Sequence, residues 1–353
     1  MLSWLTDYQS DRTQFSVVNG QHSTVLNVTC GIPQGSVLGP TLFALYTNDL
    51  PNSVSSGTVF MYAGDTTVYC LGDTVDSAVT SLNRALSELN RWCQESSLTP
   101  HSAKCEAVLL MRKPYIGPLN SVIIGEDQIE WVKHTRLLGV TFDDRLSWSQ
   151  HLTDVKKSFV NKLNLLKRSS VLSRDALLDL YFQVFLPLVL YGLVVWGGSV
   201  NMEQLNSLEK FHRRAAGVIY NLPRGMPSAD VYRHSKWKTL NYLHKLRLIK
   251  LFYKVFSSEA PAALSYLVNK PCAAYDFRRS NNVSVPCFNS CFFKNSISHR
   301  GAILWNAVST YFTGSQFTAF YRNVKKDKYV KDFDLSAQSV RSLPGQYHDF
   351  KCY

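Results

Sequence analysis

The sequence of 353 residues has few cysteines and no long uninterrupted hydrophobic run. Its eight cysteines are widely spaced, which excludes a small disulfide-stapled fold and favours reduced thiols. The first seven residues lack the basic and apolar regions of a signal peptide, so we expect a nuclear or cytoplasmic protein that is not secreted. The most apolar stretch, Leu177–Trp196, is interrupted by Asp179 and Pro187 and falls short of the roughly 20 apolar residues that cross a bilayer. A buried helix is therefore expected there, without membrane association.

Basic residues are scarce in the first part of the chain, and acidic residues are scarce in the second. Residues 1–150 contain nine Lys or Arg and 14 Asp or Glu, whereas residues 151–353 contain 29 and 12. Hydrophobic residues make up 45% of the chain and charged residues 18%, which favours a folded protein with a sizeable core. The length favours about two domains. The basic second part predicts a polyanionic partner, with nucleic acid as the leading candidate.

Hydrophobic periodicity and turn residues predict mixed strands and helices in the first 150 residues. Residues 14–30 are expected to form a hairpin around Asn19-Gly20, and residues 58–71 a second hairpin that turns at Ala63-Gly64-Asp65. Ser36 is the expected N-cap of a helix that ends near residue 49. The other predicted elements are a helix over residues 74–97 and short strands near 105–111, 120–124, 128–132 and 137–142.

The second part is predicted to be helical, beginning with the apolar stripe Val155, Phe159, Leu163 and Leu166. Further helices are expected over residues 177–195, 205–220, 242–256 and 297–308. Trp196, Trp237 and Trp305 are expected in the core, residues 271–295 are expected to be extended, and the last 40 residues to be ordered only in part.

Two motifs stand about 30 residues apart in this sequence. The first is Gly31-Ile32-Pro33-Gln34-Gly35-Ser36-Val37-Leu38-Gly39-Pro40, and the second is Phe60-Met61-Tyr62-Ala63-Gly64-Asp65-Thr66-Thr67. In this order the pair resembles motifs B and C of the reverse transcriptases of LINE-type (non-LTR) retrotransposons. Further segments that resemble the same family lie at residues 98–106 (motif D), 137–151 (primer grip), 187–197, 208–215, 278–280 and 300–306. The resemblance therefore covers about residues 1 to 310.

This resemblance implies an α+β fold in three parts. Residues 1–146 would form a truncated palm, an antiparallel sheet backed by the helices at 36–49 and 74–97. Residues 147–225 would form a helical thumb. Residues 226–353 would form a basic helical C-terminal region with a partly disordered tail.

The resemblance also assigns roles to individual residues. Phosphoryl transfer with two metals needs carboxylates that hold two cations about 3.5–4 Å apart, and Asp65 at the second hairpin would be one Mg²⁺ ligand. Pro33, Gln34, Gly35 and Ser36 would contact the template and the incoming nucleotide, since Gly35 has no Cβ to obstruct a close approach. Lys104 would lie near the departing pyrophosphate, although an ordinary surface lysine is the alternative.

The sequence departs from the family pattern where the chemistry takes place. Motif C of the family has two adjacent Asp residues, and the first is replaced here by Gly64. The motif A Asp of the family has no counterpart, because only 30 residues precede Gly31 and their acids, Asp7 and Asp11, lie in a helix-like or turn-like stretch. With Asp65 alone, the Mg²⁺ site is incomplete, and we expect no polymerase activity from the chain as written. A non-catalytic nucleic-acid-binding protein and an inert transposon remnant are the two alternatives.

Basic residues on two predicted helices are candidates for contacts with RNA and DNA. They are Arg213 and Arg214 on the helix over 205–220, and Lys245, Arg247, Lys250 and Lys254 on the helix over 242–256. A solvated helix face is the alternative for the second group. A zinc site at Cys287, Cys291 and His299 is disfavoured, because its fourth ligand would fall at Leu304.

Overall fold

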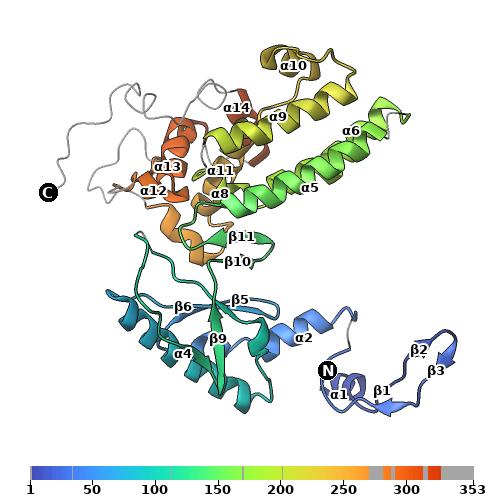
Figure 1. Cartoon of the computed structure of the whole chain (residues 1–353), viewed down its shortest axis with the longest axis vertical. Coiled ribbons are helices and arrows are strands. Elements are labelled where there is room, and N and C mark those ends of the chain that lie inside the picture. Colours follow the sequence, from blue (N-terminus) through green and yellow to red (C-terminus); the bar gives the residue numbers. More distant parts are fainter. Residues whose placement is uncertain are drawn as a thin grey trace. The chain divides into compact units, whose positions relative to one another are not determined.

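The computed structural model of the chain describes residues 2–33, 35–111, 113–168, 171–200, 202–269, 281–287, 291–312 and 317–326. These residues mix helices and strands, which agrees with the predicted α+β class (Figure 1). The chain divides into two compact units, the first comprising Met1–Leu109 and Lys113–Val132 and the second comprising Leu110–Arg112 and Lys133–Tyr353. The three-part division at residues 146 and 225 stays a prediction.

The first unit is built around helix α4 (Val75–Glu95), as the sequence predicts. The Thr74 hydroxyl accepts the Ser77 N–H and the Ser77 hydroxyl accepts the Thr74 N–H, each at 3.1 Å, so a capping box starts the helix. The buried face of α4 includes Leu86, Leu89 and Trp92. The helix packs against strands β6 (Asp65–Tyr69) and β8 (Val122–Ile124). The other helices of this unit are α1 (Leu2–Gln9), α2 (Gly39–Tyr46), α3 (Leu50–Ser53) and the 3₁₀ turn η1 (Ser102–Lys104).

The strands of the first unit do not form the single antiparallel palm sheet that was expected. Strands β5 (Thr58–Tyr62) and β6 (Asp65–Tyr69) form an antiparallel pair, and β7 (Glu106–Ala107), β8 (Val122–Ile124) and β9 (Asp127–Trp131) form a separate sheet in the order β7-β9-β8. Strand β7 pairs in parallel with β9, because the chain reverses once before β8 and again at the Gly125 turn. Parallel pairing therefore replaces part of the expected antiparallel sheet.

The N-terminal hairpin is confirmed by the structure. Strands β2 (Val17–Val18) and β3 (Gln21–His22) pair across Asn19-Gly20, and both turn residues have positive φ, as a tight two-residue turn requires. Strands β1 (Thr13–Gln14) and β4 (Leu26–Asn27) continue the antiparallel arrangement.

The second unit begins with a hairpin where a single strand over residues 137–142 was expected. Strands β10 (His134–Leu137) and β11 (Val140–Asp143) pair across Leu138-Gly139, whose positive φ values reverse the chain. The side chains of Val140 and Phe142 pack on the core formed by the helices that follow.

The first helical core of this unit surrounds Phe159, Tyr181 and Trp196. The predicted helix over 177–195 is wrong as a continuous element, because Tyr191 is extended and Gly192 is left-handed with φ of 61°. The helices are α5 (Ser149–Arg168), α6 (Arg174–Leu180), the π-helical turn η2 (Tyr181–Phe185), α7 (Leu186–Leu190), α8 (Leu193–Trp196), α9 (Met202–Ile219) and α10 (Ser228–Ser235). The α5 stripe predicted from the sequence is buried, as is Trp237.

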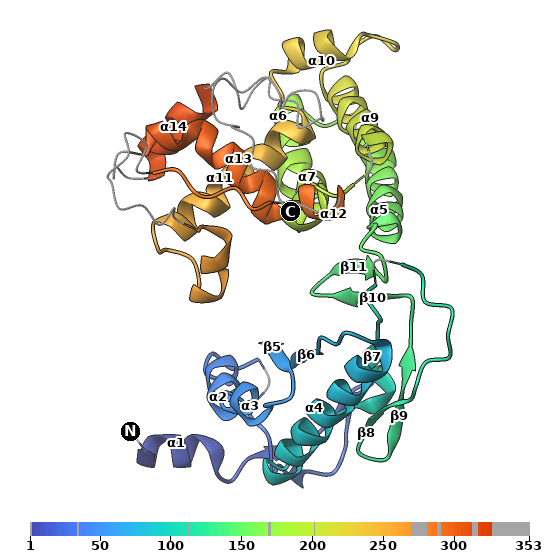
Figure 2. The ribbon, with the colours of Figure 1, turned by 90° about the vertical axis from the view of Figure 1, so that its left-hand side faces the viewer.

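A second helical core surrounds Phe252, Trp305 and Phe320. Its main helices, α11 (Leu240–Phe256), α13 (Ile297–Val308) and α14 (Phe317–Lys326), are drawn together in Figure 2. The core is also formed by η3 (Ala262–Leu267) and η4 (Ser309–Tyr311). Helix α13 has the predicted bounds, whereas α14 lies in the segment that was expected to be ordered only in part. The extended prediction for 271–295 is wrong at the short helix α12 (Cys291–Lys294), and residues 270–280 and 327–353 lie outside the described residues. Within the described parts of the chain, no helix is both long enough and apolar enough to cross a membrane.

Candidate functional site

The motif C segment forms the β5–β6 hairpin, with Asp65 beside its turn. Tyr62 pairs with Asp65 across the two residues Ala63-Gly64, and Ala63 takes a positive φ of 50°. Asp65 is exposed, and its side chain makes no hydrogen bond or ion pair with any described residue. The hairpin therefore presents a single carboxylate to solvent at its end.

Helix α4 fixes the start of this hairpin through Glu88. The carboxylate of Glu88 accepts the backbone N–H groups of Ser55 and Ser56 at 2.6 and 3.1 Å and also accepts both serine hydroxyls. Donation from the Ser56 hydroxyl is the main cause that lowers the pKa of Glu88 to about 2, against the opposing effect of burial. Because β5 begins two residues after Ser56, these hydrogen bonds fix the start of the hairpin against α4.

The motif B segment is a compact loop before α2. Gly31 and Gly35 have positive φ, and no atom lies within 4 Å of a Cβ built at Gly35, so the backbone is open to a close approach there. The Ser36 N–H donates to the Pro33 carbonyl at 3.4 Å, and the Ser36 hydroxyl accepts the Gly39 N–H at 3.0 Å. The capping bond of Ser36 is thus present, although the helix begins at Gly39, three residues later than expected. Gln34 lies outside the described residues.

Lys104 ends the turn η1 and is exposed beside β7. No hydrogen bond or ion pair among the described residues joins Lys104, Asp65 and the loop from Pro33 to Ser36. The residues implied by the family resemblance are therefore presented separately by the first unit, on three different segments.

The donor set does not fit the two Mg²⁺ ions of phosphoryl transfer. Asp7 lies on helix α1 and Asp11 in a bend with φ of 51°, so neither acid lies on a palm strand. The part of the chain that the structure describes contains no group of three or more His, Cys, Asp or Glu side chains that could hold a metal ion. One exposed carboxylate cannot replace the water shell of two ions that dehydrate reluctantly.

Two residues of the disfavoured zinc motif, Cys287 and His299, have side chains that the structure describes. The imidazole Nδ1 of His299 lies 2.9 Å from the Pro286 carbonyl, and His299 is buried on α13. Cys287 is exposed.

The basic residues of α9 differ in their surroundings. Arg213 is partly buried beside Glu209, and its charge lowers the pKa of that carboxyl, which burial raises more strongly. Arg214 is exposed, and its guanidinium carbon lies 5.6 Å from the ring centre of Phe211. Arg214 is therefore the more accessible of the two cations.

The basic residues of α11 lie on two different faces. Lys245 is only 2% exposed, so the prediction that it contacts nucleic acid is wrong. It precedes the buried Leu248 and Ile249 by three and four residues, and this spacing places it on the packed face. Arg247, Lys250 and Lys254 are exposed, and their spacings of three and four place them along one solvent face.

Helix α14 is one of the elements that sequence reasoning missed. Its apolar residues Phe317, Phe320, Tyr321 and Val324 follow the helical spacing of three, four and seven, which was the available signal. It carries the exposed cations Arg322 and Lys325.

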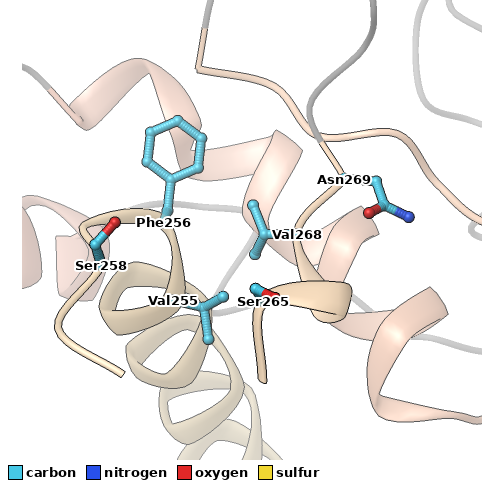
Figure 3. Close-up of a pocket in the computed structure, with 6 residues that line it drawn as sticks. All are labelled: Val255, Phe256, Ser258, Ser265, Val268 and Asn269. Carbon is cyan, nitrogen blue, oxygen red and sulfur yellow. The ribbon is translucent and has the colours of Figure 1, made fainter. Parts of the chain in front are cut away.

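A pocket of about 440 Å³ lies at the end of α11, next to Lys254 in sequence (Figure 3). It is lined by Val255, Phe256, Ser258, Ser265, Val268 and Asn269. Because none of these side chains carries a charge, the pocket offers neither a carboxylate for a metal ion nor a cation for a phosphate.

Comparison with known proteins identifies the class to which this site belongs. Residues 2–142, which hold the motif B loop and the β5–β6 hairpin, match the family model described as "Reverse transcriptase (RNA-dependent DNA polymerase)". Over these residues the chain is similar to reverse transcriptases, and its relatives are named as RNA-directed DNA polymerases of mobile elements.

The relatives are proteins of insect mobile elements. The chain is 26% identical over 240 residues to "RNA-directed DNA polymerase from mobile element jockey" of Drosophila melanogaster, which covers 65% of this chain and 26% of the relative. It is 31% identical over 226 residues to "Probable RNA-directed DNA polymerase from transposon X-element" of the same species, covering 62% and 25%. The chain thus spans about a quarter of the length of these relatives. No solved structure matches.

Proposed function

We propose that this chain is a nucleic-acid-binding segment of a reverse transcriptase that does not by itself catalyse DNA synthesis. The observation that carries the proposal is the β5–β6 turn, where Gly64 stands beside Asp65 and leaves one exposed carboxylate. RNA-templated synthesis in the family requires a metal site that a single carboxylate cannot build. The names of the relatives support RNA and DNA as the partners.

The first unit retains features that suit contact with a template and primer. The loop from Pro33 to Ser36 would admit a nucleotide near Gly35, where the backbone is open. Asp65 would hold at most one cation weakly, and Lys104 would meet a phosphate from its exposed position. These roles rest on the family pattern and belong to the proposal.

The second unit would supply the electrostatic affinity. It holds 33 Lys or Arg against 14 Asp or Glu, whereas the first unit holds five against 12. A phosphate backbone gains counterion-release free energy only on the positive surface. We therefore place binding on the second unit, through Arg213, Arg214 and the exposed face of α11 with Arg247, Lys250 and Lys254.

Primer extension tests the catalytic half of the proposal. The purified chain, given an RNA template, a DNA primer and Mg²⁺ or Mn²⁺, is expected to incorporate no nucleotides above a buffer blank, because two of three carboxylates are missing from residues 1–353. Template-dependent incorporation would overturn the proposal.

The Gly64→Asp variant serves as the companion. It restores the second carboxylate of motif C, and the turn has room for it, yet activity should stay absent because the motif A ligand is still missing. Recovery of activity in this single variant would show that another carboxylate of the chain completes the site.

A further inference from the structure

Helices α11 and α14 together hold a pair of aromatic rings between two lysines. The rings of Phe317 and Tyr321 are stacked, with centroids 5.1 Å apart and planes inclined by 24°. The Lys250 ammonium of α11 lies 5.6 Å from the Phe317 centroid, and the Lys325 ammonium of α14 lies 4.6 Å from the Tyr321 centroid. Each end of the ring pair is therefore within cation–π distance of a lysine.

Further cations extend this feature. Arg247 on α11 lies near enough to Tyr321 to lower the pKa of its phenol, although burial of the phenol raises that pKa more strongly. Arg322 is exposed on α14. We define the ring–cation patch as the six residues Arg247, Lys250, Phe317, Tyr321, Arg322 and Lys325.

The three helices that surround the patch carry no acidic residue of their own. Helices α11, α13 and α14 contain no Asp or Glu at all, so the four cations of the patch have no acidic neighbour on these three elements. In addition, the Tyr242 hydroxyl donates to the Lys325 carbonyl at 3.3 Å, which holds the end of α14 to the start of α11. The patch is thus a positively charged surface on a fixed frame.

The fully buried anchors of α14 are residues other than the ring pair, although the Phe317 ring also lies 4.9 Å from the Tyr253 ring. Phe320 and Val324 are fully buried and hold the helix in the second core, together with Tyr253 and Trp305. Phe317 and Tyr321 lie at the border of that core and are partly exposed. Lys250 and Lys325 are exposed, so their side chains can leave the rings without disturbing the core.

We propose that the ring–cation patch binds single-stranded nucleic acid by exchanging partners. Backbone phosphates bind to the four cations of the patch, Arg247, Lys250, Arg322 and Lys325. When a lysine moves from its aromatic ring to a phosphate, a base can stack on that ring. The exchange is favourable because base–aromatic stacking is worth more than an exposed cation–π contact, and each lysine gains a phosphate. A duplex keeps its bases paired and stacked, so it uses only the cations. This inference rests on the proposed function, in which the second unit binds nucleic acid.

Fluorescence anisotropy on the full chain tests whether the four cations of the patch bind phosphates. The affinity is measured for labelled single-stranded RNA, single-stranded DNA and a duplex over a range of salt concentrations. One variant replaces Arg247, Lys250, Arg322 and Lys325 by Gln. The matched control replaces the exposed residues Lys157, Lys167, Arg168 and Arg224 by Gln and loses the same charge. The patch variant should lower the slope of log affinity against log salt by about 3 units on single strands, and the control by less than about 1. Equal slopes for both variants would overturn the patch.

A second pair of variants tests the rings. Tyr321→Leu keeps an apolar side chain and all charges, so it should weaken single-strand binding by about fivefold to 100-fold while the salt slope and the duplex affinity stay unchanged. Tyr321→Phe keeps the ring and should bind as the parent does. Single-strand affinity that is equal in Tyr321→Leu and Tyr321→Phe would overturn the exchange. Matching circular dichroism and thermal unfolding must accompany each comparison.

The outcomes separate the two proposals. A parent chain that binds no nucleic acid would overturn both the proposed function and the patch. A parent chain that binds, together with a folded patch variant that binds equally well, would overturn the patch and the binding role of Arg247 and Lys250, and would leave nucleic-acid binding by the second unit standing.

Discussion

Single glycines have opposite roles in the two units. At Gly64 an added Cβ meets no atom within 4 Å, so the β5–β6 turn has room for the carboxylate that the family pattern places there. The difference from the family pattern at residue 64 is therefore the loss of a carboxylate, and the backbone of the turn does not require glycine there. At Gly301 the opposite holds, because an added Cβ would lie 2.0 Å from the Phe252 ring, where α13 crosses α11.

This contrast gives a prediction for stability. Gly301→Ala should lower the free energy of unfolding by about 1–3 kcal/mol or more, because Phe252 is fully buried and cannot move aside. Gly217→Ala is the matched control, since Gly217 lies inside α9 with no atom within 4 Å of an added Cβ, and it should stabilise the protein by about 0.5–1 kcal/mol. Urea unfolding measures both. An unchanged midpoint for Gly301→Ala would contradict the close α11–α13 packing.

At the scale of elements, a buried polar network joins the π-helical turn η2 to α9, α10 and the start of α11. The Tyr181 hydroxyl donates to His212 Nδ1, and His212 Nε2 donates to the Lys238 carbonyl at 3.0 Å. Glu209 accepts the Tyr232 hydroxyl and, at 2.9 Å, the Leu240 N–H. A π-helical turn displaces one residue of a helix. Here the turn η2 begins at Tyr181, whose ring stacks on the Trp237 ring with 4.4 Å between the two ring centres.

The network predicts a loss of stability in mild acid. Burial lowers the pKa of His212 to about 4, against an ordinary value of about 6.5 that applies in the unfolded chain. Below about pH 6.5, His212 is therefore protonated in the unfolded chain but stays neutral in the folded protein until the pH nears 4. The free energy of unfolding should fall by about 1.4 kcal/mol per pH unit for this residue until the pH nears 4. His244, whose pKa burial lowers to about 3, adds to the same trend.

Urea unfolding between about pH 7.5 and 4.5 measures this dependence. His212→Gln should remove about one histidine's share of the slope, because the group that titrates in the unfolded chain is gone. The exposed His234→Gln is the matched control. A slope that is equal in His212→Gln and in the parent would contradict the role of His212.

At the scale of the whole molecule, the two compact units carry opposite charge and separate cores. The core of the first unit includes Trp92 and Val122, and the two clusters of the second unit surround Trp196 and Trp305. Because the hairpin β10–β11 packs on α5, the natural division lies after Val132.

This division predicts where nucleic-acid affinity lies. A fragment of residues 133–353 should shift labelled RNA at about 0.1 M salt, whereas residues 1–132 should not, because a negative surface repels phosphate. Gel shift with both fragments, after circular dichroism shows that each is folded, decides the point. Binding by the first fragment alone would contradict the charge argument.

Local sequence determined the features that depend on a few adjacent residues. The Asn19-Gly20 and Ala63-Gly64 turns, helix α4 and the bounds of α13 were all predicted, because turn geometry and helical periodicity are set by residues a few positions apart. The motifs of residues 31–40 and 60–67 likewise predicted the reverse transcriptase family, which the comparisons confirm.

Only the tertiary structure decided features that depend on distant partners. Lys245 and Arg247 are two residues apart on one helix, yet only the packing of the second core determines that Lys245 is buried and Arg247 exposed. The parallel pairing of β7 with β9 joins residues 24 positions apart, and the contact of Lys250 with Phe317 joins residues 67 positions apart. No local pattern contains such partners, because burial and pairing are properties of the surface that a segment meets after folding.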